Sequence, residues 1–216
     1  MARLLLIGAV TIPLSGCVSS SGLIEAEISS TPVEYAQLID GPHTIPAVDI
    51  SDIDSEMLRQ RVDYPTGEPV GTIVVDTAAR HLYLVEGDGK AMRYGIGVGK
   101  EGLAFAGAAI VKRKAEWPHW RPTKNMMDRE PARYRHLASG LVGGLGNPLG
   151  PRALYLYQGD QDTLFRIHGT TEPETIGGAV SSGCIRLINQ DIVDLYRRVR
   201  IGSRVVVIQR SRELSS

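Results

Sequence analysis

Short apolar runs separated by turn residues predict that the chain after residue 70 is built mainly from β-strands. Residues 72–76 are a dense β-branched run, and residues 80–85 alternate between polar and apolar positions. The Gly-Asp-Gly sequence at 87–89 is typical of a tight turn. The basic run at 112–114 is expected at the solvated end of a strand. Further strands are expected over residues 92–98, 108–111 and 205–208.

Helical patterns are short and few. Asn189 has the side chain of a good N-cap, and residues 190–200 place apolar side chains on one face, with Asp191 near the start and three arginines near the end, as the helix dipole favours. Shorter helices are expected over residues 54–62 and 125–133. Many strands, few helices and 24 glycines predict a mainly β fold, a β-sandwich or partly open barrel with a mixed sheet.

The first 16 residues have the pattern of an export signal. Arg3 precedes an apolar run over residues 4–14, which is shorter than the roughly 20 residues that span a bilayer. The sequence at 14–17, Leu-Ser-Gly-Cys, resembles a bacterial lipobox, after whose cleavage Cys17 would be a lipid-modified N-terminus. The alternative is a plain signal peptide in which this cysteine is incidental.

We therefore divide the chain into a signal peptide at 1–16, a segment at 17–65 and a catalytic domain at 66–210. The segment at 17–65 has no sustained periodicity and is rich in Ser, Pro and Asp. Two hypotheses stay open for it. It is either a flexible tether that holds an anchored enzyme away from the membrane, or an N-terminal extension that packs on the domain.

Charge and residue spacing bear on which partners and cofactors are expected. The formal net charge is zero, so we expect no nucleic-acid partner. His119 and His136 lack metal-ligand spacing with any Cys, Asp or Glu, and we expect no metal and no cofactor. If Cys17 carries lipid, Cys184 has no disulfide partner, which is itself an argument that its thiol is reactive.

His168 and Cys184, 16 residues apart, are the candidate catalytic pair. A thiol is a weak nucleophile and its thiolate a strong one, so a nearby imidazole has to take the proton and a third group has to orient that imidazole. The separation suits a strand, a loop and a second strand that bring both side chains to one end of a sheet. Gly183 allows a strained turn whose N–H groups could face a developing oxyanion.

The run from His168-Gly169-Thr170 to Ser181-Ser182-Gly183-Cys184-Ile185-Arg186 closely resembles the signature of the L,D-transpeptidases with a YkuD-type catalytic domain, and the resemblance extends over about residues 71–207. It implies that Cys184 is the nucleophile and His168 its base. It also implies that the carbonyl of Gly169 orients the imidazole and that the segment from Ser182 through Gly183 to Cys184 forms the oxyanion hole.

The same resemblance implies that Ser181 and Arg186 contact substrate, with Arg186 holding a substrate carboxylate or bracing the loop. Many members have a second histidine where this chain has Ser182. Because the base is the earlier histidine, we expect activity to survive this difference and the pH dependence to change.

Two further positions are candidate substrate contacts. Trp117 lies in a stiff aromatic stretch that could form one wall of a cleft, although a loop packing its own tryptophans is the alternative. Asn147 lies in a glycine-rich segment, residues 139–150, that lacks a phosphate-binding motif and fits a substrate loop better.

The resemblance thus implies a peptidoglycan L,D-transpeptidase that forms an acyl-enzyme with a stem tetrapeptide, releases D-Ala and passes the acyl group to an amine of peptidoglycan or of an anchored protein. The alternatives are an L,D-carboxypeptidase that uses water, and a non-catalytic wall-binding lipoprotein. The expected location is the periplasm of a Gram-negative bacterium, with lipid on Cys17 as the membrane anchor.

Overall fold

The computed structural model describes residues 32–99, 106–180 and 184–209. By its contacts the chain divides into residues 1–30 and 31–216, and every feature below belongs to the second part. The predicted signal peptide, the predicted lipidation site Cys17 and the loop residues Ser181, Ser182 and Gly183 lie outside the described residues. In the described part of the chain, no helix is both long and apolar enough to cross a membrane.

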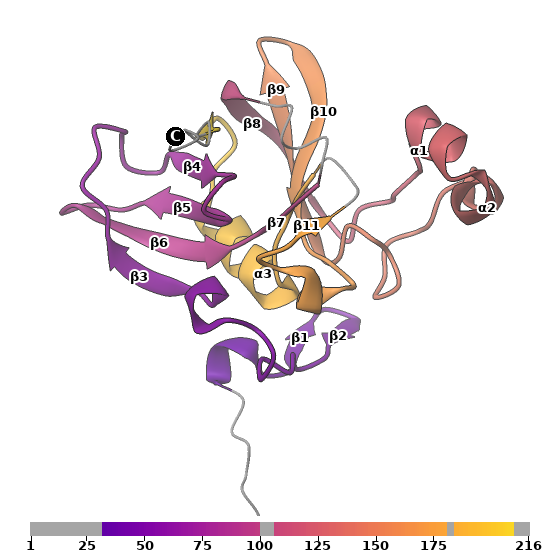
Figure 1. The fold of residues 1–216 in the computed structure, drawn as a ribbon, viewed down its shortest axis with the longest axis horizontal. Coiled ribbons are helices and arrows are strands. Elements are labelled where there is room, and N and C mark those ends of the chain that lie inside the picture. Colours follow the sequence, from indigo (N-terminus) through magenta and orange to yellow (C-terminus); the bar gives the residue numbers. More distant parts are fainter. Residues whose placement is uncertain (1–31, 100–105, 181–183, 210–216) are drawn as a thin grey trace, which may run out of the picture. The chain divides into compact units, whose positions relative to one another are not determined.

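Strands dominate the described residues (Figure 1). The strands are β1 (Leu38–Asp40), β2 (His43–Ile45), β3 (Gln60–Asp63), β4 (Ile73–Asp76), β5 (His81–Val85), β6 (Lys90–Gly95), β7 (Gly97–Gly99), β8 (Gly107–Glu116), β9 (Arg152–Gln158), β10 (Gln161–His168), β11 (Ala179–Val180), β12 (Ile185–Arg186) and β13 (Arg204–Ile208). The α-helices are α1 (Lys124–Arg129), α2 (Pro131–Tyr134) and α3 (Asn189–Arg198). Single 3₁₀ turns occupy Val33–Tyr35, Ser55–Met57, Arg135–Leu137 and Pro173–Thr175.

All described strands except the β1–β2 hairpin join one mixed sheet in the order β11-β7-β12-β10-β9-β8-β13-β4-β5-β6-β3. The pairs β13–β4, β10–β12 and β11–β7 are parallel, and the others are antiparallel. Only Ile96 separates β6 from β7, yet these strands lie near opposite ends of the sheet order. The sheet therefore has to curl back on itself, which confirms the predicted mainly β fold with a mixed sheet and few short helices.

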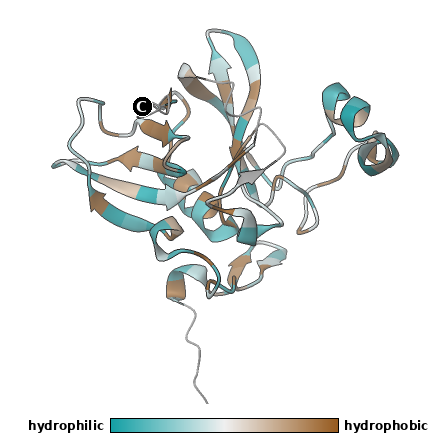
Figure 2. Cartoon of the chain, in the orientation of Figure 1, coloured by the Kyte–Doolittle hydropathy of each residue, from teal (hydrophilic) through white to brown (hydrophobic). Residues whose placement is uncertain are grey.

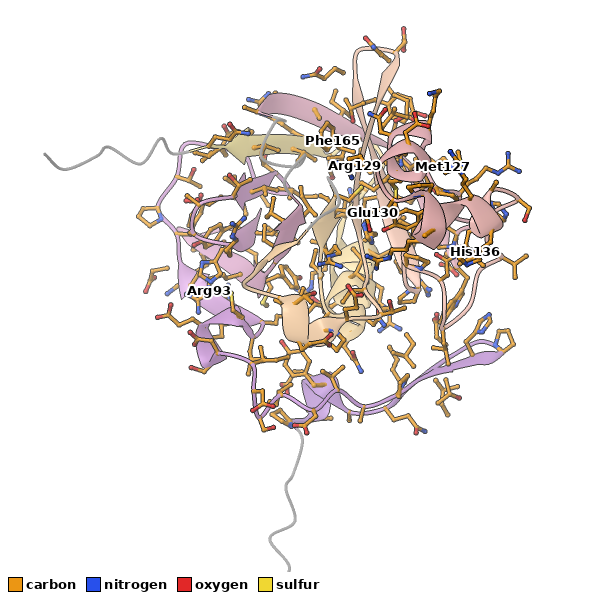
Figure 3. All side chains as sticks on the ribbon, turned by 45° about the vertical axis from the view of Figure 1, so that its right-hand side comes forward. Arg93, Met127, Arg129, Glu130, His136 and Phe165 are labelled. Carbon is orange, nitrogen blue, oxygen red and sulfur yellow. The ribbon has the colours of Figure 1, made fainter. Side chains whose placement is uncertain are left out.

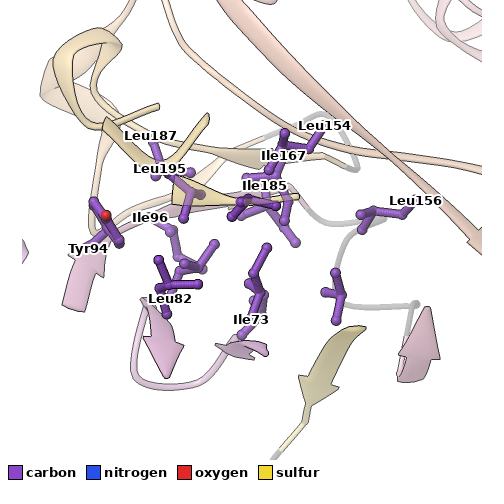
Figure 4. Packing of buried hydrophobic residues seen from close by; sticks show 14 of the residues in the cluster. Ile73, Leu82, Tyr94, Ile96, Leu154, Leu156, Ile167, Ile185, Leu187 and Leu195 are labelled. Carbon is purple, nitrogen blue, oxygen red and sulfur yellow. The ribbon is translucent and has the colours of Figure 1, made fainter. Parts of the chain in front are cut away.

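The curled sheet encloses a large apolar core, to which α3 adds Ile192 and Leu195 and the residue after the helix adds Val199. Figure 4 shows side chains from β4 to β6 facing those from β10 and β12, with Ile73 and Leu82 on one side and Ile167 and Ile185 on the other. In Figure 2 the strands around the core mix hydrophobic and hydrophilic residues, whereas α1 is mainly hydrophilic. The core fixes the strands that carry the candidate catalytic residues.

Residues 32–63 pack against the domain as an extension. The chain forms β3, which pairs with β6, so the predicted helix over residues 54–62 is wrong and only a 3₁₀ turn precedes the strand. Tyr35 and Val48 form a second buried cluster with Ile176 and Ile188 of the domain. Residues 32–63 therefore form an extension that packs on the domain, which is one of the two hypotheses considered for this segment.

Three local predictions need correction. The basic run at 112–114 lies inside β8 rather than at a strand end, since that strand continues to Glu116, and Lys114 donates hydrogen bonds to the carbonyls of Tyr196 and Val199. The helix expected over residues 125–133 is split by Glu130 and Pro131 into α1 and α2. Ile188 rather than Asn189 is the N-cap of α3.

Candidate active site

His168 ends β10 with its imidazole buried, since only 4% of the residue is exposed. Its Nδ1 lies 2.6 Å from the carbonyl oxygen of Gly169. A carbonyl can only accept a hydrogen bond, so Nδ1 has to carry the proton and donate it. In the neutral ring this leaves the lone pair on Nε2, the nitrogen that can accept a proton from a thiol.

The surroundings of His168 keep its ring neutral. The pKa of His168 is lowered to about 4, chiefly by burial and also by the nearby cations Arg186 and Arg166, whereas the hydrogen bond to Gly169 opposes this shift. The imidazole is therefore in its basic form throughout the neutral range. Arg166, two residues earlier on β10, is itself held by Asp162 at 2.7 Å.

Cys184 stands immediately before β12, which pairs in parallel with β10. The register sets Ile185 beside Ile167 in the core and Arg186 beside His168. Because side chains alternate along a strand, Cys184 belongs to the same face of the sheet as His168 and Arg186. The residue is half-buried, and its carbonyl accepts a hydrogen bond from the N–H of Gly99 at 3.4 Å. His168 therefore ends β10, and Cys184 directly precedes the neighbouring strand β12.

Arg186 is buried against the loop that follows His168. Its Nη1 donates to Glu172 at 3.0 Å, and Glu172 also lies 3.9 Å from Arg133. The Nε and Nη2 of Arg186 have no hydrogen-bond partner within the described residues. Arg186 thus forms an ion pair with Glu172, and both roles considered for it, bracing the cysteine loop and holding a substrate carboxylate, stay predictions.

Gly169 is confined by three neighbouring side chains. A Cβ at this position would lie 2.3 Å from Asn189 Oδ1 and 2.9 Å from Pro151 Cδ. The same Asn189 oxygen accepts a hydrogen bond from the N–H of Thr170 at 2.9 Å. Asn189 therefore holds the loop after His168, a role that its helix-capping pattern did not indicate.

Asn147 is almost completely buried, with 1% exposed. It lies in the segment between β8 and β9, residues 117–151, which carries α1 and α2 and which we call the α1–α2 arm. Its Nδ2 donates to the carbonyls of Pro118, Leu141 and Val142, and its Oδ1 accepts from the N–H of Leu149. These bonds close the loop on itself. The substrate contact of Asn147 stays a prediction.

Trp117 lies against the N-terminal extension. Its Nε1 donates to Asp40 at 2.8 Å, and its ring stacks on His43 with centroids 4.0 Å apart. Asp40 in turn accepts two hydrogen bonds from Arg152, both at 2.7 Å. Trp117 thus joins the β1–β2 hairpin to the domain, and its predicted substrate contact is untested.

The α1–α2 arm leaves the sheet between β8 and β9. In Figure 3 the labelled side chains of Met127, Arg129, Glu130 and His136 all lie on this arm. Trp120 packs near Tyr134 and pairs by its backbone with Leu141, which returns the chain to the sheet.

A cavity of about 390 Å³ lies beside the loop that follows His168. One wall comes from the N-terminal extension, and the other comes from the loop at 170–174 and from Asn189. Sequence reasoning missed this cavity because its walls are more than 100 residues apart in the chain. In the part of the chain that the structure describes, no three His, Cys, Asp or Glu side chains gather as metal ligands.

The comparisons with known proteins agree on one catalytic domain. A family model for the L,D-transpeptidase catalytic domain (YkuD) matches residues 71–207. The probable L,D-transpeptidase ErfK/SrfK of Escherichia coli (strain K12) is 37% identical over 139 residues, which are 63% of this chain and 43% of that protein. The probable L,D-transpeptidase YbiS of the same strain is 35% identical over 153 residues, which are 70% of this chain and 48% of that protein. The chain thus spans less than half the length of these two relatives.

Solved structures support the fold. A crystal structure from Brucella melitensis, named a probable carnitine operon oxidoreductase caia, is 52% identical, covers 74% of this chain and 99% of that chain, and has a TM-score of 0.51. Its name refers to redox chemistry, whereas the family model and both Escherichia coli relatives refer to L,D-transpeptidases. The Ldtfm-avibactam carbamoyl enzyme, at 19% identity and a TM-score of 0.50, covers 67% of this chain and 51% of that chain and shows the fold alone. Since the family model covers more than half of the chain, this protein belongs to the L,D-transpeptidases with a YkuD-type catalytic domain.

Proposed function

We propose that the protein is a cysteine-dependent peptidoglycan L,D-transpeptidase in which Cys184 is the nucleophile and His168 its base. The observation that carries this proposal is the state of His168, which is buried and neutral, with its Nδ1 fixed by the Gly169 carbonyl. His168 ends β10, and Cys184 precedes β12, the strand that pairs with β10. An imidazole with a fixed tautomer and a free Nε2 lone pair is what a thiol needs for deprotonation.

In the acylation step, Nε2 of His168 takes the proton of the Cys184 thiol, and the sulfur attacks the carbonyl carbon at the L-centre of the diaminoacyl residue of a stem tetrapeptide. The bond from that carbon to the nitrogen of D-Ala breaks. The leaving nitrogen takes the proton from His168, so D-Ala departs as an amine and a thioester remains. N–H groups of the segment from Ser182 to Cys184 would hold the oxyanion, and Arg186 with Ser181 would hold the stem peptide.

In the second step, an amine attacks the thioester carbonyl and the carbon–sulfur bond breaks. His168 takes the proton that the amine nitrogen loses and returns it to the sulfur, which restores the thiol. Another stem peptide gives a peptidoglycan cross-link, a protein lysine gives an anchored protein, and water gives carboxypeptidase action. These residues need no metal or organic cofactor for either step.

The test is intact-mass analysis of the full chain in detergent, incubated with a tetrapeptide muropeptide and separately with a carbapenem. We expect a mass gain with both reagents in the wild type and none in Cys184→Ala. Released D-Ala with a cross-linked product indicates transfer, and D-Ala without one indicates hydrolysis. Adducts that persist in a folded Cys184→Ala protein would contradict the assignment of the nucleophile.

An inactive but folded wild-type protein would favour a wall-binding lipoprotein instead. A pull-down with purified peptidoglycan would then show binding that is equal in the wild type and Cys184→Ala.

We further propose that the protein is a periplasmic lipoprotein anchored by lipid on Cys17. The support is the short apolar run before Leu-Ser-Gly-Cys, which is a sequence pattern and lies outside the described residues. In cells fed an alkyne-bearing fatty acid, the full chain should incorporate the label and Cys17→Ala should not. Equal labelling of both proteins would contradict the assignment.

A further inference from the structure

The peptide group between Gly169 and Thr170 has a hydrogen bond on each of its two edges. On one edge, the Gly169 carbonyl oxygen accepts from Nδ1 of His168 at 2.6 Å. On the other edge, the Thr170 N–H donates to Oδ1 of Asn189 at 2.9 Å. A peptide group is planar and nearly always trans, so its carbonyl and its N–H point in opposite directions and turn together. Asn189 and His168 are therefore connected through one rigid unit.

Backbone partners fix the chain before this peptide group but not the group itself. The Gly169 N–H donates to the carbonyls of Leu149 and Arg152 at 3.0 and 3.3 Å. The next bonds along the chain are those of a glycine, whose backbone turns more freely than that of other residues. Among the described residues, Asn189 is the sole acceptor of a hydrogen bond from the Thr170 N–H. The orientation of the peptide group therefore depends on Asn189.

The amide oxygen of Asn189 also packs directly on glycine backbone. A Cβ added at Gly169 would lie 2.3 Å from this oxygen, and a Cβ added at Gly150 would lie 2.5 Å from it. Real Cβ contacts are essentially never that short, so a larger residue at either position would displace the oxygen. Two glycines thus leave the space from which Asn189 reaches the Thr170 N–H.

The first turn of α3 is anchored independently of this loop. Gln190, next along the helix, donates to three carbonyls of the N-terminal extension at 2.8 to 3.4 Å. Asp191 accepts a hydrogen bond from the Tyr35 hydroxyl, also in the extension, at 3.3 Å. Because the two residues that follow it are held in this way, Asn189 has a fixed backbone from which to hold the loop.

We infer that Asn189 is a positioning residue for the base, because it fixes the peptide group whose carbonyl orients the His168 imidazole. The inference rests on the proposed function, in which His168 takes the thiol proton. The peptide group cannot turn without breaking the partly buried hydrogen bond from Thr170. The Gly169 carbonyl therefore stays beside Nδ1, and Nε2 keeps its lone pair for the Cys184 thiol.

Three substitutions at residue 189 separate the acceptor oxygen from the bulk of the side chain. Asn189→Leu keeps the volume and removes the acceptor, Asn189→Ala removes both, and Asn189→Asp keeps an acceptor oxygen. The matched control is Thr175→Val, which removes the hydrogen bond from the Thr175 hydroxyl to the Glu172 carbonyl at 2.6 Å in the same loop. This control alters the loop without removing a bond of the Gly169–Thr170 peptide group.

The first readout is the rate of acylation by a carbapenem, measured by intact mass in single turnovers with the full chain in detergent. We expect Asn189→Leu to lower the maximal rate constant about tenfold to a hundredfold, because a misplaced base loses on that order of its effect. The carbapenem concentration that gives half of this rate should stay close to the wild-type value, since the base is altered and ligand binding is not. Asn189→Asp and Thr175→Val should stay close to the wild-type rate.

The second readout is the tautomer of His168, which needs no chemistry. In protein labelled with ¹⁵N in its histidine rings, the chemical shifts of the two ring nitrogens report which of them carries the proton. The signals of His168 are assigned by their loss in His168→Gln. At neutral pH we expect the proton on Nδ1 in the wild type, in Asn189→Asp and in Thr175→Val, and a mixture of both tautomers in Asn189→Leu.

A wild-type rate and a wild-type tautomer in folded Asn189→Leu would overturn the inference. An equal loss in Thr175→Val, or the same loss in Asn189→Asp, would overturn it as well. Should Asn189→Leu not fold, the same outcomes are measured with Asn189→Ala. Each of these results leaves the proposed function intact, whereas a wild-type protein that forms no adduct would overturn the proposed function and the inference with it.

Discussion

At the scale of single residues, the candidate site depends on how His168 is held. Its Nδ1 is committed to the Gly169 carbonyl, and Gly169 in turn has no room for a side chain beside Asn189. The base is thus positioned by backbone and by a helix residue rather than by a carboxylate. Within the described ranges, no carboxylate is among the groups that shift the pKa of His168, and the neighbouring Arg166 and Arg186 oppose an imidazolium.

The pH dependence of acylation should reflect this environment. Because the pKa of His168 is about 4, the ring stays basic as the pH falls through 6.5, the usual histidine value. We expect the rate of carbapenem acylation to fall only near pH 4, where His168 becomes protonated. The measurement is intact mass in single turnovers from pH 3.5 to 7.5. An inflection near pH 6.5 would contradict the assigned base.

Arg166→Gln provides a test of the cause, since Arg166 is one of the cations that lower this pKa. The inflection should move upward but stay below pH 6.5, because burial is the larger cause. Arg113→Gln is the control, because Arg113 stacks on the same Tyr155 ring as Arg166 and is not among the groups that shift the pKa of His168.

At the scale of elements, α3 links the N-terminal extension to the site. Its first turn is buried on the extension side, where Gln190 is 4% exposed and Asp191 is fully buried. The 3₁₀ turn Ser55–Met57 adds a second contact, since Met57 leaves no space for a Cβ at Gly95. The extension therefore behaves as part of the domain.

Replacing Gln190 should loosen this attachment. Gln190→Met keeps the volume of the side chain but leaves the carbonyls of Tyr35, Ala36 and Pro46 without this donor, so we expect a loss of about 1–3 kcal/mol in the free energy of unfolding. Urea unfolding followed by circular dichroism measures it. Gln158→Met, which removes an exposed hydrogen bond to Ala108, should change stability by less than about 0.5 kcal/mol. Equal effects of the two substitutions would show that the extension is not held by Gln190.

At the scale of the whole molecule, two buried groups make stability respond to pH in opposite directions. The folded state lowers the pKa of His168 from 6.5 to about 4, so the unfolded chain binds more protons between these values and stability rises with pH there. Burial raises the pKa of Asp191 from 3.8 to about 7, so the folded chain binds more protons in that range and stability falls as pH rises. The two contributions offset each other between about pH 4 and 6.5.

Single substitutions should reveal each contribution. Asp191→Asn removes the fall in stability with rising pH. The free energy of unfolding of this variant, relative to wild type, should therefore rise from pH 4 to 6.5 by roughly 3 kcal/mol at most. His168→Gln removes the rise in stability with rising pH, so the free energy of unfolding of this variant, relative to wild type, should fall over the same pH range. Chemical denaturation at pH 4, 5, 6 and 7 measures both, and the difference from wild type cancels the other titrating groups. Parallel curves for all three proteins would contradict the opposing pair.

The elements that the sequence pattern predicted well are those set by local chemistry. The β-branched run at 72–76 and the alternation at 80–85 correspond to β4 and β5, because each strand buries side chains in the core. The helix expected over residues 54–62 failed because the pairing of β3 with β6 is a long-range choice that no local pattern encodes. Asn189 failed as a cap because its side-chain oxygen is bonded to Thr170 instead.

The candidate site also has features that local sequence predicts and features that depend on long-range contacts. The chemistry of His168 and Cys184 follows from residue types and spacing, and the parallel pairing of β10 with β12 is compatible with it. The contact of Trp117 with Asp40 joins residues 77 apart, and the cavity beside the loop after His168 joins walls that are farther apart still. Such features depend on the three-dimensional arrangement, which residue spacing does not specify.

The position of β13 in the sheet has a consequence for how the protein is made. This strand is the last of the described strands, yet it lies between β8 and β4, where it joins the two halves of the sheet. Residues 204–208 are synthesised after every other described strand, so until they emerge from the ribosome β4 and β8 each lack one neighbour. Until β13 emerges, nascent chains should therefore hold two half-sheets that no strand joins, and β10 and β12 belong to a complete sheet only after β13 has paired.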